Sequence, residues 1–534
     1  MLSNTSRLFL TFFLTFQALG FYFTHSGMET WDSASHLNQS QWLIHRFFFT
    51  PFVTPEVGVT WYGPLWETVL GIFSEILFRG LHDPTWIRYS INFTLLPITL
   101  FFTFKMLRRA DYSKGTAFLA VVLLLGCIRL GGHSILNTKD FPLACAYLLV
   151  SLYFWIFLTE LRNKSIHDPL SRKEVLIGSG LAVVPYLVRP PMIFHILLWL
   201  TWCFSRTLMM PSRSKKGIAK EILKPILAMV FWFYLLWPTL WTASPRNIID
   251  SIRKFSHFPV GGLTRVFSET YDVQHLPIWY PYAWIPVILH PFTFALLILG
   301  LGLCLFPGAP FLKGTGVQFK SIKLSLKSWL ALCFALPCLA ILIKHPVFYD
   351  EERHVLFLFP ILLVLGALGF EKIKGSWKLS MGALSLILSG MTYAQWGRYS
   401  YIYQSPLVGH TLFTGDYWAV CTSDMINELP HYVPEGARIG YLMPPPIVRL
   451  QLNRLHNSTY PPLKNFPDYS FEELDPSHYM PPENGYVLSL NRFDRGEIER
   501  ADLNSGRAKQ VFALTLPTKE TACRLLYYPK LSKP

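Results

Sequence analysis

Apolar runs long enough to cross a lipid bilayer recur along most of this chain. A membrane-spanning helix needs about 20 mostly apolar residues, and we count about eleven such runs. Of the 534 residues, 51% are hydrophobic and only 15% are charged, whereas a typical soluble domain is about a quarter charged. The pattern excludes an ordinary soluble protein and a disordered chain. It predicts a mainly α fold, a polytopic bundle of membrane helices.

One further apolar stretch is set apart from the predicted spans. Residues 65–78 are interrupted by Glu67 and Glu75, so we interpret them as an interfacial helix in the first outer loop. Counting this stretch as a span would place Arg108 and Arg109 on the outer side of the membrane. The expected spans are 8–23, 91–106, 117–130, 141–158, 175–188, 192–204, 222–241, 284–305, 329–343, 355–368 and 379–391.

The formal net charge of +15 is concentrated in short clusters of Lys and Arg between the spans. Loops rich in Lys and Arg stay on the cytoplasmic side of a membrane, which predicts a cytoplasmic N-terminus and an extracytoplasmic C-terminus. This distribution also argues against a nucleic-acid partner. The clusters are Arg108, Arg109 and Lys114; Arg162, Lys164, Arg172 and Lys173; Arg213, Lys215, Lys216 and Lys220; Lys320, Lys323 and Lys327; and Lys372, Lys374 and Lys378.

Composition divides the chain into two predicted domains. Residues 1–396 hold the spans and form the membrane domain, which has a long, aromatic first outer loop at 25–89. Residues 397–534 are rich in Pro and charge, and their short apolar runs bounded by Gly, Pro and Asn predict strands of a small α/β domain outside the membrane. These runs are 438–442, 485–490 and 510–516.

The eight cysteines include no CxxC pair and no spacing of zinc ligands. Six of them lie in apolar runs, which is typical of small buried side chains. Cys421 and Cys523 lie in the tail, where an extracytoplasmic location would allow a disulfide, and two free thiols are the alternative.

Ionisable residues gather in the segments predicted to lie outside. Glu29 and Asp32 follow the first span, with His36 one turn later. A carboxylate held at the membrane surface can act as a general base toward a hydroxyl group. The alternative for both acids is an ordinary hydrated loop.

The predicted link 131–140 carries His133, Asn137, Lys139 and Asp140 in about ten residues between two spans. Its two glycines allow tight backbone turns. Asp140 precedes Phe and Pro, so it suits either the cap of the next helix or a role in substrate binding. The two roles are compatible.

Two arginines are predicted on the same outer face. Arg189 is a lone cation between two apolar runs, and ionisable groups at membrane depth are candidates for function. Arg353 and His354 end the segment YDEERH, where Arg353 either pairs with its acidic neighbours or presents its guanidinium to a phosphate. Acids beside a hydroxyl acceptor and cations beside a phosphate are what glycosyl transfer from a lipid phosphate requires.

These segments resemble GT-C glycosyltransferases, in particular the bacterial family related to dolichyl-phosphate-mannose protein mannosyltransferases and aminoarabinose transferases. The similar segments are HSILNTKDFPLA, YDEERHVLFLFP and FTGDYW (413–418). The resemblance implies a polyprenyl-phosphate-linked sugar donor, transfer with inversion on the outer face of a bacterial inner membrane, and a glycolipid, polysaccharide or protein acceptor.

By position, the resemblance implies that Asp32 is the catalytic base and that Asp140 is the second-loop acid, near the acceptor or a divalent metal ion. Arg189 and Arg353 match phosphate ligands. One departure is that the protein mannosyltransferases have adjacent Asp-Glu where this chain has Asp32-Ser33. The base is therefore Asp32 alone, or Glu29 contributes.

Two other classes of protein compete with a transferase. A transporter or flippase of lipid-linked sugars commonly shows internal repeats and broken helices in the membrane, and neither is evident in this sequence. A structural membrane subunit would leave the outer acids and arginines unexplained. The sequence does not identify the sugar, the acceptor or a metal requirement.

Overall fold

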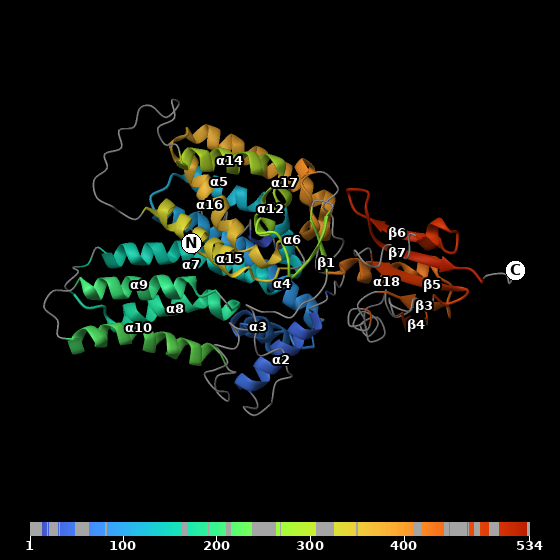
Figure 1. The fold of residues 1–534 in the computed structure, drawn as a ribbon, viewed down its shortest axis with the longest axis horizontal. Helices are drawn as coiled ribbons and strands as arrows, with labels where there is room; N and C mark the ends of the chain where they lie inside the picture. Colours follow the sequence, from blue (N-terminus) through green and yellow to red (C-terminus); the bar gives the residue numbers. More distant parts are fainter. Residues whose placement is uncertain are drawn as a thin grey trace.

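Helices make up most of the described chain as far as Ile402, and a small sheet follows them. In the computed structural model the helices form an elongated bundle, and the sheet lies beyond one end of it with the C-terminus (Figure 1). The mainly α fold predicted from the sequence is confirmed. The structure describes residues 13–15, 17–18, 20, 30, 33–48, 63–80, 83–162, 164, 168–190, 192–209, 215–237, 263–266, 269–305, 325–348, 351–408, 418–442, 448, 467, 469–474, 481–490 and 501–530.

The segment predicted to be the first outer loop contributes short helices that pack beside the bundle. They are α2 (Ser33–Phe48), α3 (Pro64–Gly71) and the π-helix η2 (Ile72–Leu77). The predicted interfacial helix at 65–78 corresponds to α3 and η2. The hydroxyl of Ser40 in α2 donates to the backbone carbonyl of Glu67 in α3 at 2.9 Å, so the two helices of this loop are tied together.

Polar side chains mark where several bundle helices begin. The Asp83 carboxylate accepts a bond from the backbone N–H of Thr85 at 2.7 Å, which caps the next helix. Ser171 and Glu174 form a reciprocal capping box. The bundle helices are α4 (Pro84–Arg109), α5 (Lys114–Leu125), α6 (Ile128–Leu136), α7 (Asp140–Arg162), α8 (Arg172–Val188), α9 (Phe194–Leu208), α10 (Lys215–Leu236), α12 (Tyr280–Ala283), α13 (Ile285–Ile288), α14 (Pro291–Leu305), α15 (Leu326–Lys344), α16 (Leu358–Gly369) and α17 (Gly375–Trp396).

Among the described residues, three helices are long and apolar enough to cross a membrane by length and composition, namely α4, α7 and α15. The helices α5 and α14 are apolar but shorter. Every predicted span after the first overlaps a helix, and the first, 8–23, lies largely outside the described residues. The total of about eleven spans remains a prediction.

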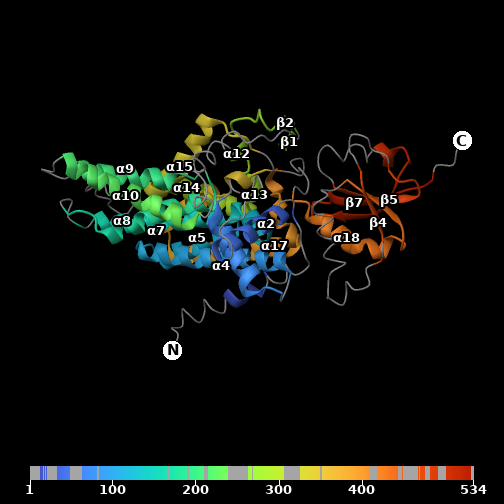
Figure 2. The same cartoon turned by 90° about the horizontal axis from the view of Figure 1, so that it is seen from below.

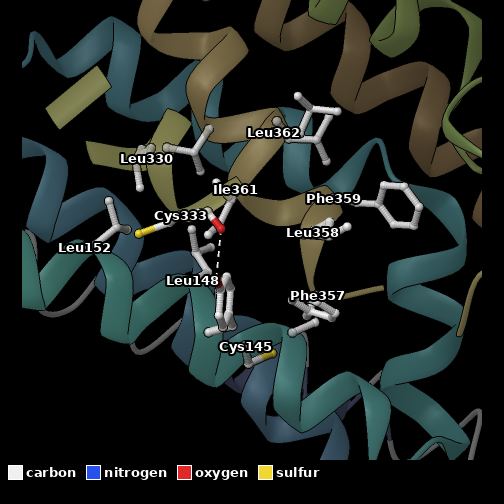
Figure 3. Packing of buried hydrophobic residues seen from close by; sticks show 14 of the residues in the cluster. Cys145, Leu148, Leu152, Leu330, Cys333, Phe357, Leu358, Phe359, Ile361 and Leu362 are labelled. Carbon is white, nitrogen blue, oxygen red and sulfur yellow. Dashed lines mark hydrogen bonds between the residues drawn. The ribbon is translucent and has the colours of Figure 1, made fainter. Parts of the chain in front are cut away.

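The centre of the bundle is a buried apolar cluster. Leu148 and Leu152 of α7 lie beside Leu330 and Cys333 of α15 (Figure 3). The hydroxyl of Tyr147 donates to the backbone carbonyl of Cys333 at 2.8 Å, which links the same two helices. This packing fixes the position of α7 and therefore of the polar residues at its start.

Neither 117–130 nor 284–305 is one continuous helix, so both predicted spans were wrong in extent. The backbone carbonyl of Gly126 accepts a hydrogen bond from the backbone N–H of His290 at 3.0 Å. This contact lies where α5 ends and where α13 and α14 are separated. The break depends on two segments far apart in the sequence, which an apolar pattern does not reveal.

The predicted link 131–140 is also largely helical, because α6 covers its first half. Its glycines have no positive φ, so the predicted turn role was wrong. A Cβ added to Gly132 would lie 2.0 Å from the backbone N of Tyr401. Tyr401 belongs to the 3₁₀ helix η7 (Gly397–Ile402), so the absence of a side chain at Gly132 lets η7 pack directly on α6.

The tail holds a mixed five-stranded sheet of order β4-β3-β5-β7-β6. The strand β3 is parallel to β4 and β5, while β7 is antiparallel to β5 and β6. Figure 2 shows α18 on the side of the sheet that faces the bundle. All three predicted strand runs are strands (β3, β5 and β6), whereas β4 and β7 were not predicted. The elements are α18 (Val420–Tyr432), β3 (Arg438–Tyr441), β4 (Ser470–Glu473), β5 (Gly485–Leu490), β6 (Lys509–Thr515) and β7 (Thr521–Tyr528), and a separate hairpin pairs β1 (Leu263–Val266) with β2 (Glu269–Asp272).

A disulfide joins Cys421 of α18 to Cys523 of β7, with the two Cα atoms 5.9 Å apart. The sequence left a disulfide and two free thiols as alternatives, and the structure contains the disulfide. One buried apolar cluster continues from the tail domain into the bundle, and it includes Ile426 of α18, Leu136 of α6 and Tyr89 of α4. The tail is therefore packed against the end of the bundle where the polar loops meet.

Candidate functional site

A buried chain of ion pairs and hydrogen bonds runs across the end of the bundle that faces the tail. Arg129 of α6 pairs with Glu351 and also binds Glu352, the latter with Nη1 2.5 Å from Oε2. The other oxygen of Glu352 lies 3.1 Å from Nε2 of His133. Arg129, His133 and Glu352 are all less than 1% exposed. Glu351 and Glu352, the acidic residues that precede Arg353, are therefore bound by side chains of α6.

The chain continues through Asn137 to Asp140 and Arg189. The Asn137 amide lies 3.1 Å from Nδ1 of His133 and donates to one carboxylate oxygen of Asp140 at 3.2 Å. The other oxygen of Asp140 pairs with Arg189, which follows the last residue of α8. The side-chain oxygen of Asn137, not that of Asp140, accepts the backbone N–H of Asp140 at 2.9 Å. The predicted capping role therefore belongs to Asn137.

Three cations gather around His354. Burial, followed by the positive charges of Arg353, Arg189 and Lys139, holds the pKa of the His354 imidazole well below its usual value. His354 is therefore neutral at physiological pH. The three cations are themselves at most 9% exposed, and Asp140 offsets one of their charges. We call Lys139, Arg189 and Arg353 the cation cluster.

The tail contributes an aromatic ring to this cluster. Trp418 is 2% exposed, and only Ala419 separates it from the start of α18. The Arg353 guanidinium carbon lies 5.1 Å from the centroid of the Trp418 ring, and Lys139 Nζ lies 5.5 Å from it. Both distances are within the range of a cation–π interaction.

A second buried network lies beside the cluster, in the first outer loop. Glu67 of α3 receives a bond from Arg88 of α4 at 2.5 Å, and its other oxygen lies 3.1 Å from Nδ1 of His36. Burial alone would raise the pKa of Glu67, but the charges of Arg88 and His36 lower it to about 2. Glu67 is therefore ionised and holds both His36 and Arg88 in place.

A pocket lies between the two networks. It is lined by residues of the first outer loop, of α4, of the segment between α6 and α7, and of the tail. Its surface combines hydroxyl, amide and cationic groups with the aromatic rings of Tyr89 and Trp418. The lining residues are Thr30, His36, Thr85, Arg88, Tyr89, Leu136, Asn137, Thr138, Lys139 and Trp418.

The structure thus places eight of the ten candidate residues at one end of the bundle. His36, Asn137 and Lys139 line the pocket, and His133, Asp140, Arg189, Arg353 and His354 form the adjoining network. The two remaining candidates, Glu29 and Asp32, lie outside the described residues. The described helix α2 begins at Ser33, and His36 of the same helix lines the pocket.

Several residues of the site were not predicted, among them an acid and an arginine of the first loop network, one arginine of α6 and one tryptophan of the tail. Glu67 was noted only as an interruption of an apolar stretch, and Arg88 was not noticed. Arg129 lies inside a predicted span, and a charge within an apolar run is a signal of function that was overlooked. Trp418 ends the segment FTGDYW but carried no role.

The sequence left a divalent metal ion open, with Asp32 and Asp140 as ligands. Within the described part of the chain, no group of three or more His, Cys, Asp or Glu side chains is arranged to hold a metal. Both carboxylate oxygens of Asp140 are engaged, one by Arg189 and one by Asn137.

Two solved structures match this chain over 98% of its length and 98% of theirs, with a TM-score of 0.46 and 12% sequence identity. They are ArnT from Cupriavidus metallidurans bound to undecaprenyl phosphate and the same protein in the apo state. ArnT is an aminoarabinose transferase with a GT-C fold, the kind of protein that the motifs resemble. No family model and no curated protein matches the chain. The likeness is distant, and the proposed function rests on this chain's own residues.

Proposed function

We propose that this chain is an integral-membrane glycosyltransferase that moves a sugar from a polyprenyl-phosphate donor to an extracytoplasmic acceptor, with inversion at the anomeric carbon. The observation that carries the proposal is the convergence of Lys139, Arg189 and Arg353 beside a polar, aromatic pocket. These cations come from three separate segments of the chain, and Arg189 is paired with Asp140.

The cation cluster is suited to a phosphate leaving group. Guanidinium groups bind phosphate oxygens through charge-assisted hydrogen bonds, and burial strengthens the attraction by excluding water. In glycosyl transfer the bond between the anomeric carbon and the phosphate oxygen breaks, and the phosphate takes up negative charge. Fixed cations at that position stabilise the transition state.

The acceptor side of the reaction needs a base that removes the hydroxyl proton. We assign this role to Asp32, with Glu29 as the alternative, because both precede α2 in the chain and α2 carries His36 to the pocket. His36 is held by Glu67 and is positioned to bind a substrate hydroxyl. Attack by the deprotonated oxygen on the face opposite the phosphate inverts the anomeric carbon.

The distribution of charge supports a site on the extracytoplasmic face. The helix α7 begins at Asp140 in the site and ends at Arg162, and α8 runs back from Arg172 to the residue before Arg189. The 23 residues of α7 separate its two ends by roughly 35 Å. Basic loops stay in the cytoplasm, and the disulfide of the tail is typical of an oxidising compartment.

A transporter of lipid-linked sugars is the competing class. Its substrate path would cross the bundle, whereas the described candidate residues gather at one end. The centre of the bundle around α7 and α15 is packed with apolar side chains (Figure 3). This arrangement favours chemistry at the membrane surface.

The test is sugar transfer by the purified protein in liposomes, supplied with a panel of polyprenyl-phosphate sugars and membrane-extract acceptors. We expect Arg353→Ala to raise the KM for the donor about tenfold or more, because a charge-assisted bond to phosphate is lost. The matched control is Arg438→Ala, since Arg438 is exposed on β3 and pairs with Glu472 at 3.2 Å. An effect of Arg353→Ala on the acceptor KM alone would overturn the phosphate assignment.

A further inference from the structure

Trp418 is the point at which the tail domain reaches the cation cluster. Its ring lies 5.1 Å from the Arg353 guanidinium carbon and 5.5 Å from Lys139 Nζ, and it also lines the pocket. The two cations come from different segments, one before α7 and one before α16. One aromatic ring of the tail therefore contacts two cations that come from separate segments of the bundle.

A shared aromatic face has a physical consequence for two long cationic side chains. Lys and Arg have many rotamers, and ordering them on a ligand costs conformational entropy. The negative face of the indole attracts both cations and offsets part of their mutual repulsion. The ring also excludes water, which raises the attraction of the cations for an anion.

The position of Trp418 is fixed from the tail side. Ala419 follows it in a left-handed conformation, with φ of 56°, and leads into α18. Two residues further on, Cys421 is bridged to Cys523 in β7, the strand that pairs with both β5 and β6. The disulfide thus anchors the start of α18, and with it Trp418, to an inner strand of the sheet.

We propose that Trp418 is a positioning residue for the donor phosphate, that it holds Lys139 and Arg353 in their binding arrangement, and that the Cys421–Cys523 bridge keeps it there. The inference rests on the proposed function, and it gives the tail domain a part in donor recognition. Trp418 acts through the two cations and does not itself take part in the reaction.

The experiment measures the Kd of a short-chain polyprenyl monophosphate, without sugar, for the purified full-length protein. We expect Trp418→Leu to raise this Kd about tenfold, because it removes the ring but keeps an apolar side chain. Trp418→Phe retains an aromatic face and should recover most of the affinity. The double variant Cys421→Ser/Cys523→Ser should weaken binding in the same direction.

Matched controls separate this effect from a general loss of structure. Trp377→Leu alters a 65% exposed tryptophan on α17, and Cys304→Ser/Cys338→Ser alters two free cysteines, so both should bind as the wild type does. An unchanged Kd in Trp418→Leu, or a Trp418→Phe no better than Trp418→Leu, would overturn the inference. If the wild type binds the phosphate but transfers no sugar, the proposed function fails while the role of Trp418 stands.

Discussion

At the residue scale, the site is built from buried charges that bind one another across long stretches of sequence. Arg129 and Glu352 are 223 residues apart in the chain, and Glu67 and Arg88 are 21 apart. Breaking a buried pair leaves an uncompensated charge at a cost of several kcal/mol, so these contacts define the arrangement tightly. The sequence predicted several of the residues that gather at this end of the bundle. It did not predict which of these residues pair, because no local pattern encodes a contact between residues so far apart in the sequence.

The buried histidines make the stability of the protein depend on pH. His354 keeps a pKa well below its usual value because of burial and the neighbouring cations, and burial lowers the pKa of His133 as well. Below about pH 6.5 the unfolded chain takes up protons that the folded chain does not. Folding should therefore weaken as the pH falls from 7 to 5, by about 2 kcal/mol for each fully shifted histidine.

Thermal unfolding of the purified protein across this range measures the effect. His354→Gln should show a smaller loss between pH 7 and pH 5 than the wild type. His275→Gln, which alters an exposed histidine, should retain the wild-type slope. A wild-type slope in His354→Gln would mean that this histidine is not kept neutral by its surroundings.

At the element scale, local patterns predicted strands and most helices, while contacts between elements decided where helices break. The run 485–490 was predicted as a strand and is β5, and an asparagine flanks this apolar run at each end. In contrast, the run 117–130 is apolar except for Arg129, yet its first helix ends at Leu125. The hydrogen bond from His290 to Gly126 that accompanies this end joins segments that are distant in sequence.

The packing of α6 on η7 gives a prediction about Gly132. Gly132→Ala should destabilise the protein by roughly 1 to 3 kcal/mol and lower transfer, because the new Cβ would overlap the backbone of Tyr401. Gly390→Ala is the matched control, since Gly390 lies in α17 with no atom within 4 Å of the added Cβ. The control should be neutral or slightly stabilising, as alanine favours a helix.

The measurement is the melting temperature of both variants together with the rate of sugar transfer. Equal behaviour of the two glycine variants would show that close contact between α6 and η7 is not required. A loss confined to Gly132→Ala would support the interpretation that position 132 requires glycine because a side chain would not fit against η7. A turn conformation would then not be the reason.

At the scale of the whole molecule, the bundle and the tail meet at the candidate site. The helices bring the cation cluster to one end of the bundle, and the sheet lies beyond the same end (Figure 1). The segment before α4, the start of α4 and the segment between α6 and α7 supply most of the pocket, and the tail supplies Trp418. The composition of the sequence predicted two parts, but only the packing of buried residues across both shows that they share one surface.

The central claim is that an acid and a cation cluster on this surface transfer sugar from a lipid phosphate. Its most direct test is the rate at which the protein in liposomes, supplied with membrane-extract acceptors, releases polyprenyl phosphate from a polyprenyl-phosphate sugar, measured for the wild type and for Asp32→Asn. We expect release by the wild type and a fall of at least about 100-fold in the variant, because the proton acceptor is lost while the shape is kept. Passage of intact donor across the bilayer, equally in both proteins and without release, would contradict the account and establish a flippase.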